Sequence, residues 1–481
     1  MRDPGVPETV PSAWLSGATT TQSQRRITMA GLTESLAIFV SSAPEVPEAA
    51  ARIVRTGFID TIATMLAGRD EPVVGIARKF VAARRSAAHE ARVLFGEQLV
   101  AAADAALING CAAHALDYDD VALTGHPSTV LVPAVLAEGE RLGASGADAI
   151  RAYLVGYEVW AELVSREPDP YHLKGWHPTA VLGTVGAAAA IAHLNQLPAA
   201  QCRHALALAA SMAGGLVANF GTMTKPLHAG RAAACAIEAV QLAKLGLTAA
   251  PDAFEHHAGY LAALSPNGQA ERERPADGLG QQLRILDSGL SIKKYPMCYA
   301  THRVIDGVLD LVNLHQLDAA SVRQVDASIG VAQASMLRNH APVTGLEAKF
   351  SLEFAVASAL VAGKVGLAQL SDTFVATPAV REAMAKVRII TLDSHCPIEP
   401  VFAENDRVVL EMHDGRRFDT GEIRFARGNA KLPLKDAELE TKFLDCAAGA
   451  DYLDAGALYR DLVSLGQQRS LRTLASSAVV A

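Results

Sequence analysis

The chain has 481 residues, of which half are hydrophobic but only 5% aromatic, and its 43 Lys and Arg face 51 Asp and Glu for a net charge of −8. The absence of a strongly basic run argues against nucleic acid as a partner. The length predicts two or three domains, and a composition rich in Ala and Gly favours closely packed helices over sheets. Six widely spaced cysteines without a CxxC pair indicate a reducing compartment, so we expect a cytoplasmic protein.

Residues 1–28 show no apolar periodicity and predict a disordered tail, which makes Met29 a candidate start. From Leu32 to about residue 265 one helical pattern follows another. The clearest predicted helices cover 101–116, 145–164, 178–194, 199–216 and 229–245.

Two stretches, 177–202 and 204–224, contain no Asp, Glu, Lys or Arg and are nominally long enough to span a membrane. They are built from Ala, Gly, Thr, His and Asn, and Pro198 interrupts the first. Since they lack the Leu, Ile and Phe that drive insertion, we interpret them as buried helices and expect no membrane partner.

The composition becomes polar between about 265 and 290, and strands are predicted beyond it at 325–331, 387–392 and 408–412, with a hairpin turn at 413–416. Helices are expected at 299–313 and 351–363 and again after Pro433. The predicted fold class is therefore mainly α. It comprises a helical domain at 29–287, a smaller α+β domain at 288–427, and a helical segment at 428–481 that packs back on the first domain, which makes the α+β unit an insertion.

One stretch concentrates charged and titratable side chains: HALDYDDVALTGHPS, residues 114–128, holds two histidines and three carboxylates. An amphipathic helix is expected to run into it through Leu107, Cys111 and His114. The acids then lie near a helix C-terminus, where the dipole disfavours negative charge, so stability alone does not explain them. Half of an active site and a solvated acidic loop are the two interpretations that this pattern leaves open.

Two further motifs carry candidate residues. In KGWHPTA, His177 precedes Pro178 and a helix start, where backbone N–H groups attract anions, although an ordinary turn histidine would fit equally. In TKPLHAG, Lys225 follows the uncharged stretch 204–224. At the end of so apolar a segment it would be partly desolvated, with a depressed pKa, and suited to proton transfer or carboxylate binding. The alternative is a lysine that serves the helix dipole.

The motif IKKYPMCYATH contains Lys293, Cys298 and His302. Cys298 and His302 fall on one helical face, with the cysteine at the N-terminus, where a thiolate is stabilised. The alternative is a small buried hydrophobic residue. A fourth stretch, PVTGLEAKFS at 342–351, is a charged turn before a helix and suggests no chemistry by its spacing.

Metal-ligand pairs can be assembled from His172 with His177, His114 with Asp117, and Cys298 with His302. None has the spacing of a known zinc motif, so no metal is expected. The acids of DYDD are similar to the magnesium-binding acids of terpene synthases, but a carbocation pocket needs aromatic walls, and aromatic residues are scarce.

Taken in order, HALDYDD, GHPS, GWHPTAVLGT, TKPLHAG, KKYPxCxxTH and LEAKFS resemble the MmgE/PrpD family from about residue 30 to about 450. The family includes 2-methylcitrate dehydratase, cis-aconitate decarboxylase and iminodisuccinate epimerase. The resemblance implies a cofactor-independent enzyme for small polycarboxylates, a helical domain formed by both chain ends, an inserted α+β lid, and a homodimer.

At matching positions the resemblance implies a pocket lined by Asp117, His126, His177, Lys225 and Lys293. We assign His177 and Lys225 to proton transfer, His126 and Lys293 to carboxylate binding, and Asp117 to orienting a histidine. Cys298 is added as a catalytic candidate and His302 as a substrate-binding candidate.

Two positions depart from the decarboxylase pattern that the resemblance implies. Val121 stands where that branch has a threonine, and Cys298 stands where it has a histidine. Dehydration of a compound such as 2-methylcitrate is therefore the first hypothesis, with epimerisation or decarboxylation as alternatives. A catalytically inactive carboxylate-binding or scaffold protein is the alternative of another class.

Overall fold

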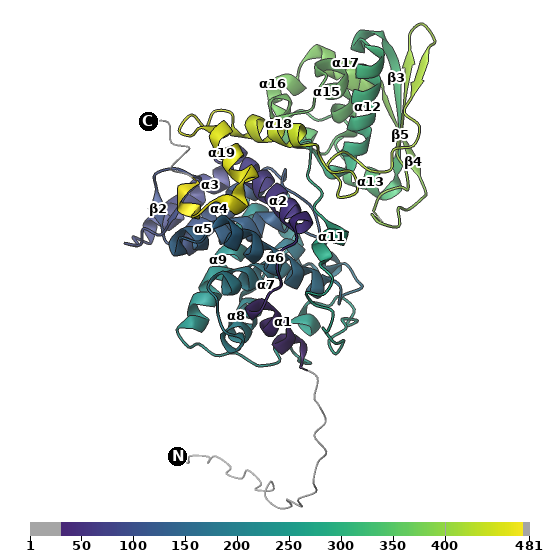
Figure 1. Ribbon diagram of the computed structural model, residues 1–481. Coiled ribbons are helices and arrows are strands. Elements are labelled where there is room, and N and C mark those ends of the chain that lie inside the picture. Colours follow the sequence, from purple (N-terminus) through teal and green to yellow (C-terminus); the bar gives the residue numbers. More distant parts are fainter. Residues whose placement is uncertain (1–29, 400, 475–481) are drawn as a thin grey trace, which may run out of the picture. The chain divides into compact units, whose positions relative to one another are not determined.

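The computed structural model describes residues 30–399 and 401–474, so the predicted tail at 1–28 and the candidate start Met29 lie outside the described residues. The described chain is mainly helical, with a small mixed sheet in its C-terminal region, as the sequence predicts (Figure 1). Its first part contains the short strand pair β1 (Ala91–Arg92) and β2 (Leu99–Val100). The helices of this part are α1 (Leu32–Ser41), α2 (Glu48–Ala67), α3 (Pro72–Ala83), α4 (Ala102–His114), α5 (Ser128–Leu142), α6 (Gly146–Val164), α7 (Pro178–Leu194), α8 (Ala199–Met212), α9 (Thr224–Lys244), α10 (Tyr260–Leu264) and α11 (Arg284–Ser288).

Helices α4 and α9 pack unusually closely, and this contact positions the most charged part of the chain. A Cβ atom on Gly110 would lie 2.7 Å from the Cα atom of Gly230, and one on Gly230 would lie 2.2 Å from the carbonyl oxygen of Leu107. Only glycine allows two helix backbones to come so near. The close packing brings the C-terminus of α4 near the first turn of α9.

The C-terminal region contains a four-stranded sheet in the order β4-β3-β5-β6, in which β3 pairs parallel with β4 and antiparallel with β5. Its strands are β3 (Val322–Gly330), β4 (Val387–Leu392), β5 (Arg407–Met412) and β6 (Arg417–Asp419). The predicted strands are thus confirmed, and the chain turns between β5 and β6 at the predicted residues 413–416. Around the sheet lie α12 (His302–His315), α13 (Val331–Met336), α14 (Gly345–Ala348), α15 (Leu352–Ala362), α16 (Asp372–Val375) and α17 (Pro378–Ala385).

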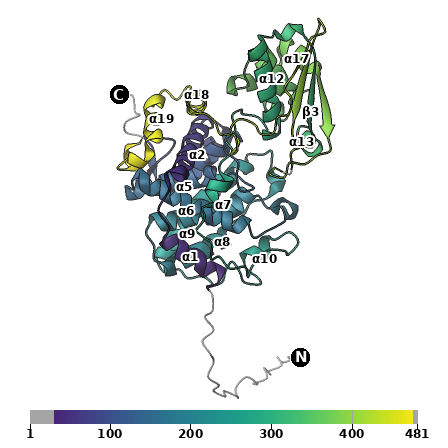
Figure 2. The same ribbon diagram turned by 45° about the vertical axis from the view of Figure 1, so that its right-hand side comes forward.

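One face of this sheet forms a hydrophobic core of its own with the helices α12, α15 and α17 (Figures 1 and 2). Every second residue of β3 from Val325 to Ile329 is buried, whereas the residues between them are partly exposed. This alternation is typical of a sheet with one face covered by helices.

The last two helices, α18 (Asp436–Ala447) and α19 (Ala455–Val463), pack against α2 near the other end of the sequence (Figure 1). Leu439 and Phe443 of α18 belong to the same hydrophobic core as Phe58 of α2. Among residues 30–399 and 401–474, no helix combines the length and the apolar character needed to cross a bilayer.

Three helix predictions differ from the structure. The helix expected at 199–216 ends at Met212, and α9 begins at Thr224 rather than at 229. The third, α5, was not expected because it carries Pro133 in its interior and is buried on all sides, so it has no polar face to mark its period.

A buried ion pair links α18 to α2. The Lys442 ammonium group donates to Asp60 Oδ1, to the carbonyl of Tyr118 at 3.0 Å, and to the carbonyl of Lys293 at 2.7 Å. Burial raises the pKa of Asp60, and the Lys442 ammonium acts in the opposite direction. All three N–H groups of one lysine are therefore used to join three distant segments.

We predict that Lys442→Met lowers the free energy of unfolding by about 3–5 kcal/mol, because it leaves the Asp60 carboxylate buried without its counter-ion. The double variant Asp60→Asn/Lys442→Met should recover a large part of this loss, since no buried charge remains. Urea unfolding followed by circular dichroism measures both. Equal losses in the single and double variants would contradict the ion-pair explanation.

Candidate active site

Asp117 lies at the centre of a cluster of charged side chains in the loop after α4. The Lys225 ammonium donates to its Oδ1 atom at 2.6 Å, and the Lys293 ammonium lies 3.2 Å from its Oδ2 atom. Lys293 also donates to the Asp117 carbonyl at 2.6 Å. Asp117 has a left-handed backbone, with φ of 53°, a conformation that costs energy in any residue with a side chain. The structure therefore holds a strained residue between two cations.

Burial alone would raise the pKa of Asp117, but the Lys225 and Lys293 ammonium groups outweigh it and hold this pKa well below its ordinary value. For Lys293 the balance has the opposite direction: burial would lower its pKa, yet Asp117 and Asp119 raise it. Asp117 is thus a carboxylate and Lys293 an ammonium at neutral pH.

The position of Lys225 corrects the sequence interpretation. It does not follow a long uncharged helix: α8 ends at Met212, the connection at 213–223 contains only the short 3₁₀ helix η2 (Val217–Asn219), and Lys225 lies in the first turn of α9. A cation at a helix N-terminus is disfavoured by the helix dipole, so serving the dipole does not explain this lysine. The ion pair with Asp117 explains why a lysine stands at this position.

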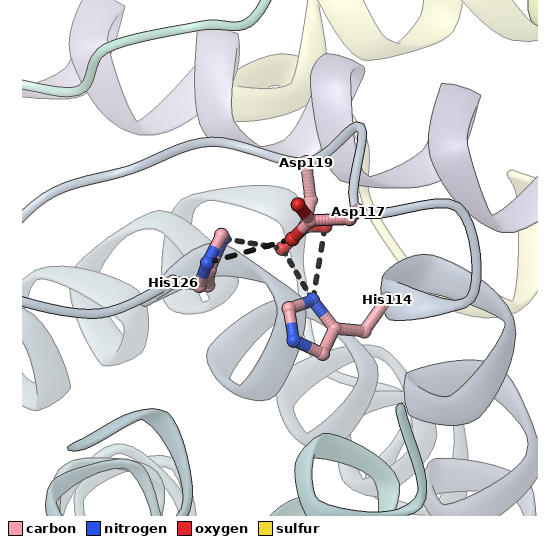
Figure 3. Close-up of side chains that lie close together, drawn as sticks. All are labelled: His114, Asp117, Asp119 and His126. Atoms are coloured by element: carbon pink, nitrogen blue, oxygen red, sulfur yellow. Dashed lines mark hydrogen bonds and ion pairs between the residues drawn. The ribbon is translucent and has the colours of Figure 1, made fainter. Parts of the chain in front are cut away.

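Asp119 joins two histidines of the same motif (Figure 3). Nδ1 of His114 lies 2.9 Å from Asp119 Oδ2, and Nδ1 of His126 lies 3.0 Å from the same oxygen. The sequence analysis assigned the orientation of a histidine to Asp117, but Asp117 Oδ1 is 3.8 Å from His126 Nε2 and much closer to the lysines. Asp119 has the orienting position.

Burial lowers the pKa of His114 to about 4, although Asp119 opposes the shift. For Asp119, burial would raise the pKa, but His114 and His126 hold it well below its ordinary value. A neutral His114 that donates through Nδ1 leaves its buried Nε2 as an acceptor without a partner among the described residues.

His177 is the residue before α7, as predicted, but its ring does not cap the helix. Its Nδ1 atom lies 3.1 Å from Nδ1 of His228 on α9, and its ring packs edge-on against Phe220 at 4.8 Å and parallel to His114 at 6.0 Å. Burial lowers the pKa of His177 well below its ordinary value, and the nearby His114 and Lys225 act in the same direction. His177 is therefore a neutral imidazole near the Lys225 ammonium, in the state required of a base.

Cys298 lies next to the cluster, directly before the short helix η3 (Tyr299–Thr301) that leads into α12. Its N–H donates to the carbonyl of Lys349 at 2.9 Å. The thiolate expected at this position is not favoured, because burial raises the pKa of Cys298 more than the backbone and Lys293 lower it. Cys298 is thus a thiol, which makes it a proton donor rather than a base.

His302 is not brought into the site. Its ring is fully buried at the start of α12 and packs edge-on against Tyr295 and Tyr299, and its Nε2 atom lies 3.3 Å from the Met297 carbonyl. Burial lowers its pKa to about 3. The structure thus places His302, the predicted substrate-binding residue, in an aromatic core.

Two residues were missed in the sequence analysis. Asp119 lies within the motif but could not be told apart from its neighbours Asp117 and Asp120 by spacing. Lys349 lies in LEAKFS, to which spacing assigned no chemistry, yet its ammonium donates to the Leu116 carbonyl at 3.1 Å. Only the tertiary fold brings this residue next to Asp117.

The donor set of His114, Asp117, Asp119 and His126 has one atom from each residue within 4.8 Å of the others, a spacing that would suit a metal ion (Figure 3). The charges around these four residues disfavour a bound metal ion. Both oxygens of Asp117 already face ammonium groups, which would repel a metal cation, and Asp119 is shared by two histidines. We conclude that the residues present do not fit a resident metal.

Paired lysines, neutral histidines and a thiol are groups suited to acid/base chemistry on a small anion. In the comparison with known proteins, residues 34–273 match the MmgE/PrpD N-terminal domain and residues 295–454 match the MmgE/PrpD C-terminal domain. The chain belongs to the MmgE/PrpD family and is an enzyme of that family, which confirms the resemblance seen in the motifs.

Relatives with curated names include cis-aconitate decarboxylase of Homo sapiens, which is 30% identical over 350 residues that cover 70% of this chain and 71% of the relative. Cis-aconitate decarboxylase of Mus musculus is 30% identical over 355 residues, or 70% of each chain. Cis-aconitate decarboxylase of Aspergillus terreus is 26% identical over 300 residues, which cover 58% of this chain and 61% of the relative.

We predict that Zn²⁺, Mn²⁺ or Mg²⁺ leaves the Tm of chelator-treated protein unchanged, because two ammonium groups compete for Asp117. A ligand that binds the folded state raises Tm, so the effect of a bound metal would be visible in differential scanning fluorimetry. The double variant Lys225→Met/Lys293→Met keeps all four donor residues but removes the competing cations, and serves as the matched control in which a metal-dependent rise is expected. A rise in the unmodified protein that is lost in Asp119→Asn would contradict the conclusion.

Proposed function

We propose that this chain is a metal-independent lyase that acts on a small polycarboxylate, with decarboxylation of cis-aconitate as the first candidate reaction. The observation that carries the proposal is the pair of ammonium groups, Lys225 and Lys293, which share Asp117. The neutral His177 is near one of them, because the Lys225 charge helps to lower its pKa. The names of the relatives favour decarboxylation over dehydration, the first hypothesis from the sequence, and over epimerisation.

In this proposal the lysines hold the carboxylates of the substrate. The two ammonium groups are donors for the oxygens of an anion, and Asp117 fixes their positions before the substrate arrives. Preorganised charges of this kind stabilise the negative charge that develops in the transition state without further reorganisation. His126, whose side chain is 14% exposed, contributes a further donor.

Decarboxylation breaks the bond between a carbon atom and its carboxylate, releases carbon dioxide, and leaves the electron pair on a carbanion conjugated with a second carboxylate. One proton must then be added to carbon. We assign this step to the Lys225 ammonium, which donates to Asp117, or to the Cys298 thiol. The neutral His177 accepts a proton where a reaction removes one, and its contact with His228 fixes which ring nitrogen is free.

Dehydration of a hydroxylated polycarboxylate such as 2-methylcitrate remains the second candidate, and one observation favours it. Cys298 and Val121 stand where the family resemblance implies a histidine and a threonine in the decarboxylase branch. Dehydration removes a carbon-bound proton, which a neutral histidine accepts, and needs an acid for the departing hydroxyl group, which a lysine or a thiol supplies.

We also propose that residues 288–427 act as a lid over the helical part formed by 29–287 and 428–481. Two features support this: the sheet and its helices have a hydrophobic core separate from that of the other helices, and Lys293 reaches the Asp117 loop from the lid segment. The homodimer and the cytoplasmic location remain predictions from the sequence.

We predict that the unmodified protein releases one carbon dioxide per cis-aconitate consumed, with or without chelator. Lys225→Ala should lower this turnover at least about 10²-fold, since it removes both a cation and a proton donor. Lys244→Ala, an exposed lysine at the other end of α9, is the matched control and should have no effect. Turnover is followed by NMR in deuterated water, with Tm measured on the same samples.

The same NMR assay applied to 2-methylcitrate and iminodisuccinate separates the candidate reactions. Loss of 2-methylcitrate with no reaction of cis-aconitate would favour dehydration. No change in any of the three compounds, with a folded protein, would overturn the proposal in favour of an inactive carboxylate-binding or scaffold protein. Activity that is abolished by chelator and restored by a metal would contradict the metal-independent mechanism.

We predict that Cys298→Ser reduces turnover at least about 10²-fold, because a serine hydroxyl is a far weaker acid than a thiol. Cys396→Ser, at a buried cysteine shortly after β4, is the control for the loss of a thiol from residues 288–427. A silent Cys298→Ser variant would show that the residue only fills space. Cys298→His should not by itself restore a faster decarboxylation, since Val121 also differs.

A further inference from the structure

Lys349 is a third lysine at the candidate site, and neither its sequence motif nor the proposed mechanism gives it a role. It lies between α14 and α15, and its half-buried side chain reaches the loop that contains Asp117, 233 positions from Leu116 in the sequence. The Lys349 ammonium donates to the Leu116 carbonyl at 3.1 Å, and its own carbonyl accepts the Cys298 N–H at 2.9 Å. Lys349 therefore contacts the residue before Asp117 and the candidate proton donor.

The surroundings of Lys349 differ from those of the other two lysines. Lys225 and Lys293 both form ion pairs with Asp117, whereas within residues 30–399 and 401–474 no carboxylate oxygen lies within ion-pair distance of the Lys349 ammonium. Burial lowers the pKa of Lys349, and the more distant Asp117 and Glu71 oppose this only in part. A half-buried cation without a counter-ion is costly, and an ammonium has three N–H donors to use.

We propose that Lys349 binds a third carboxylate of the substrate, so that the site selects tricarboxylates over dicarboxylates. The inference deepens the proposed function and rests on it. A carboxylate group next to Lys349 would supply the counter-ion that the protein itself does not provide. Lys225 and Lys293 hold two carboxylates near Asp117, and the third lies toward the Leu116 carbonyl and Cys298.

A competing explanation is that Lys349 only fixes the loop through the Leu116 carbonyl. Lys349→Gln separates the two roles, because an amide still donates to a carbonyl but carries no charge. Lys349→Arg keeps the charge, and Lys349→Met removes both the charge and the donor. Lys364→Gln, at an exposed lysine just after α15, is the matched control.

The experiment is isothermal titration calorimetry with two unreactive probes, tricarballylate with three carboxylates and glutarate with two. We expect Lys349→Gln to weaken tricarballylate binding at least about 10-fold and to leave glutarate binding within about twofold, since one charge-assisted hydrogen bond is lost only with the third carboxylate. Lys349→Arg should retain the preference, and Lys364→Gln should behave like the unmodified protein. Lys349→Met, the second variant should the glutamine variant fail to fold, is expected to lose the preference as well.

Equal weakening of both probes would assign Lys349 to holding the loop and overturn the proposal. Unchanged binding of both would show that Lys349 does not contact the ligand and overturn it too. These outcomes are distinct from a failure of the proposed function, in which the unmodified protein binds neither probe and converts no polycarboxylate.

Discussion

The carboxylate of Asp117 is shared by two ammonium groups that come from segments 108 and 176 positions away in the sequence. Neither lysine could stay next to the other in a half-buried site without this negative charge between them. Asp117 must adopt a left-handed backbone to present its side chain to Lys225 and its carbonyl to Lys293. The contact therefore joins the loop after α4 to the first turn of α9 and to the segment that leads to the sheet.

Several features of the fold support this one contact. Gly110 and Gly230 allow α4 and α9 to approach closely enough for Lys225 to reach the loop. Behind the loop, Lys442 holds the carbonyls of Tyr118 and Lys293 and is itself neutralised by Asp60. Gly110, Gly230 and Lys442, which have no proposed contact with the substrate, thus fix the backbone around Lys225 and Lys293. Supporting residues of this kind hold charged groups in place before a reaction begins.

Much of the fold could be predicted because its elements have regular periods. The helices α6 and α7 and the strands β4 and β5 lie within a residue or so of the predicted ranges. The errors have physical causes. An uncharged composition does not distinguish a buried helix from the connection at 213–223. The helix predicted before Lys225 is therefore longer than α8, and the lysine lies at the start of α9 and not at a helix C-terminus. In α5 the interior Pro133 and the lack of a polar face concealed a helix that packing stabilises.

At the site, too, local motifs indicate candidate residues, whereas the contacts between those residues depend on the tertiary fold. The family resemblance of the motifs implies Asp117, His126, His177, Lys225 and Lys293 as site residues, but which carboxylate lies between the histidines depends on the path of the loop. For Cys298 the local argument, a helix N-terminus, favoured a thiolate, whereas burial by the surrounding chain favours the thiol. His302 lies on the predicted face of α12, but that face is the core. Sequence spacing shows which residues are neighbours on one helix or strand. It does not show which side chains from a distant segment will pack against them.

We expect a polycarboxylate to bind at the shared Asp117 contact through its negative charges, and a crystal structure with bound tricarballylate tests this most directly. Carboxylate oxygens of the ligand should lie within hydrogen-bond distance of the Lys225 and Lys293 ammonium groups, with Asp117 still between them. A ligand found instead in the cavity of about 440 Å³ next to Glu158, Glu162 and Arg274, with the Asp117 cluster empty, would contradict it.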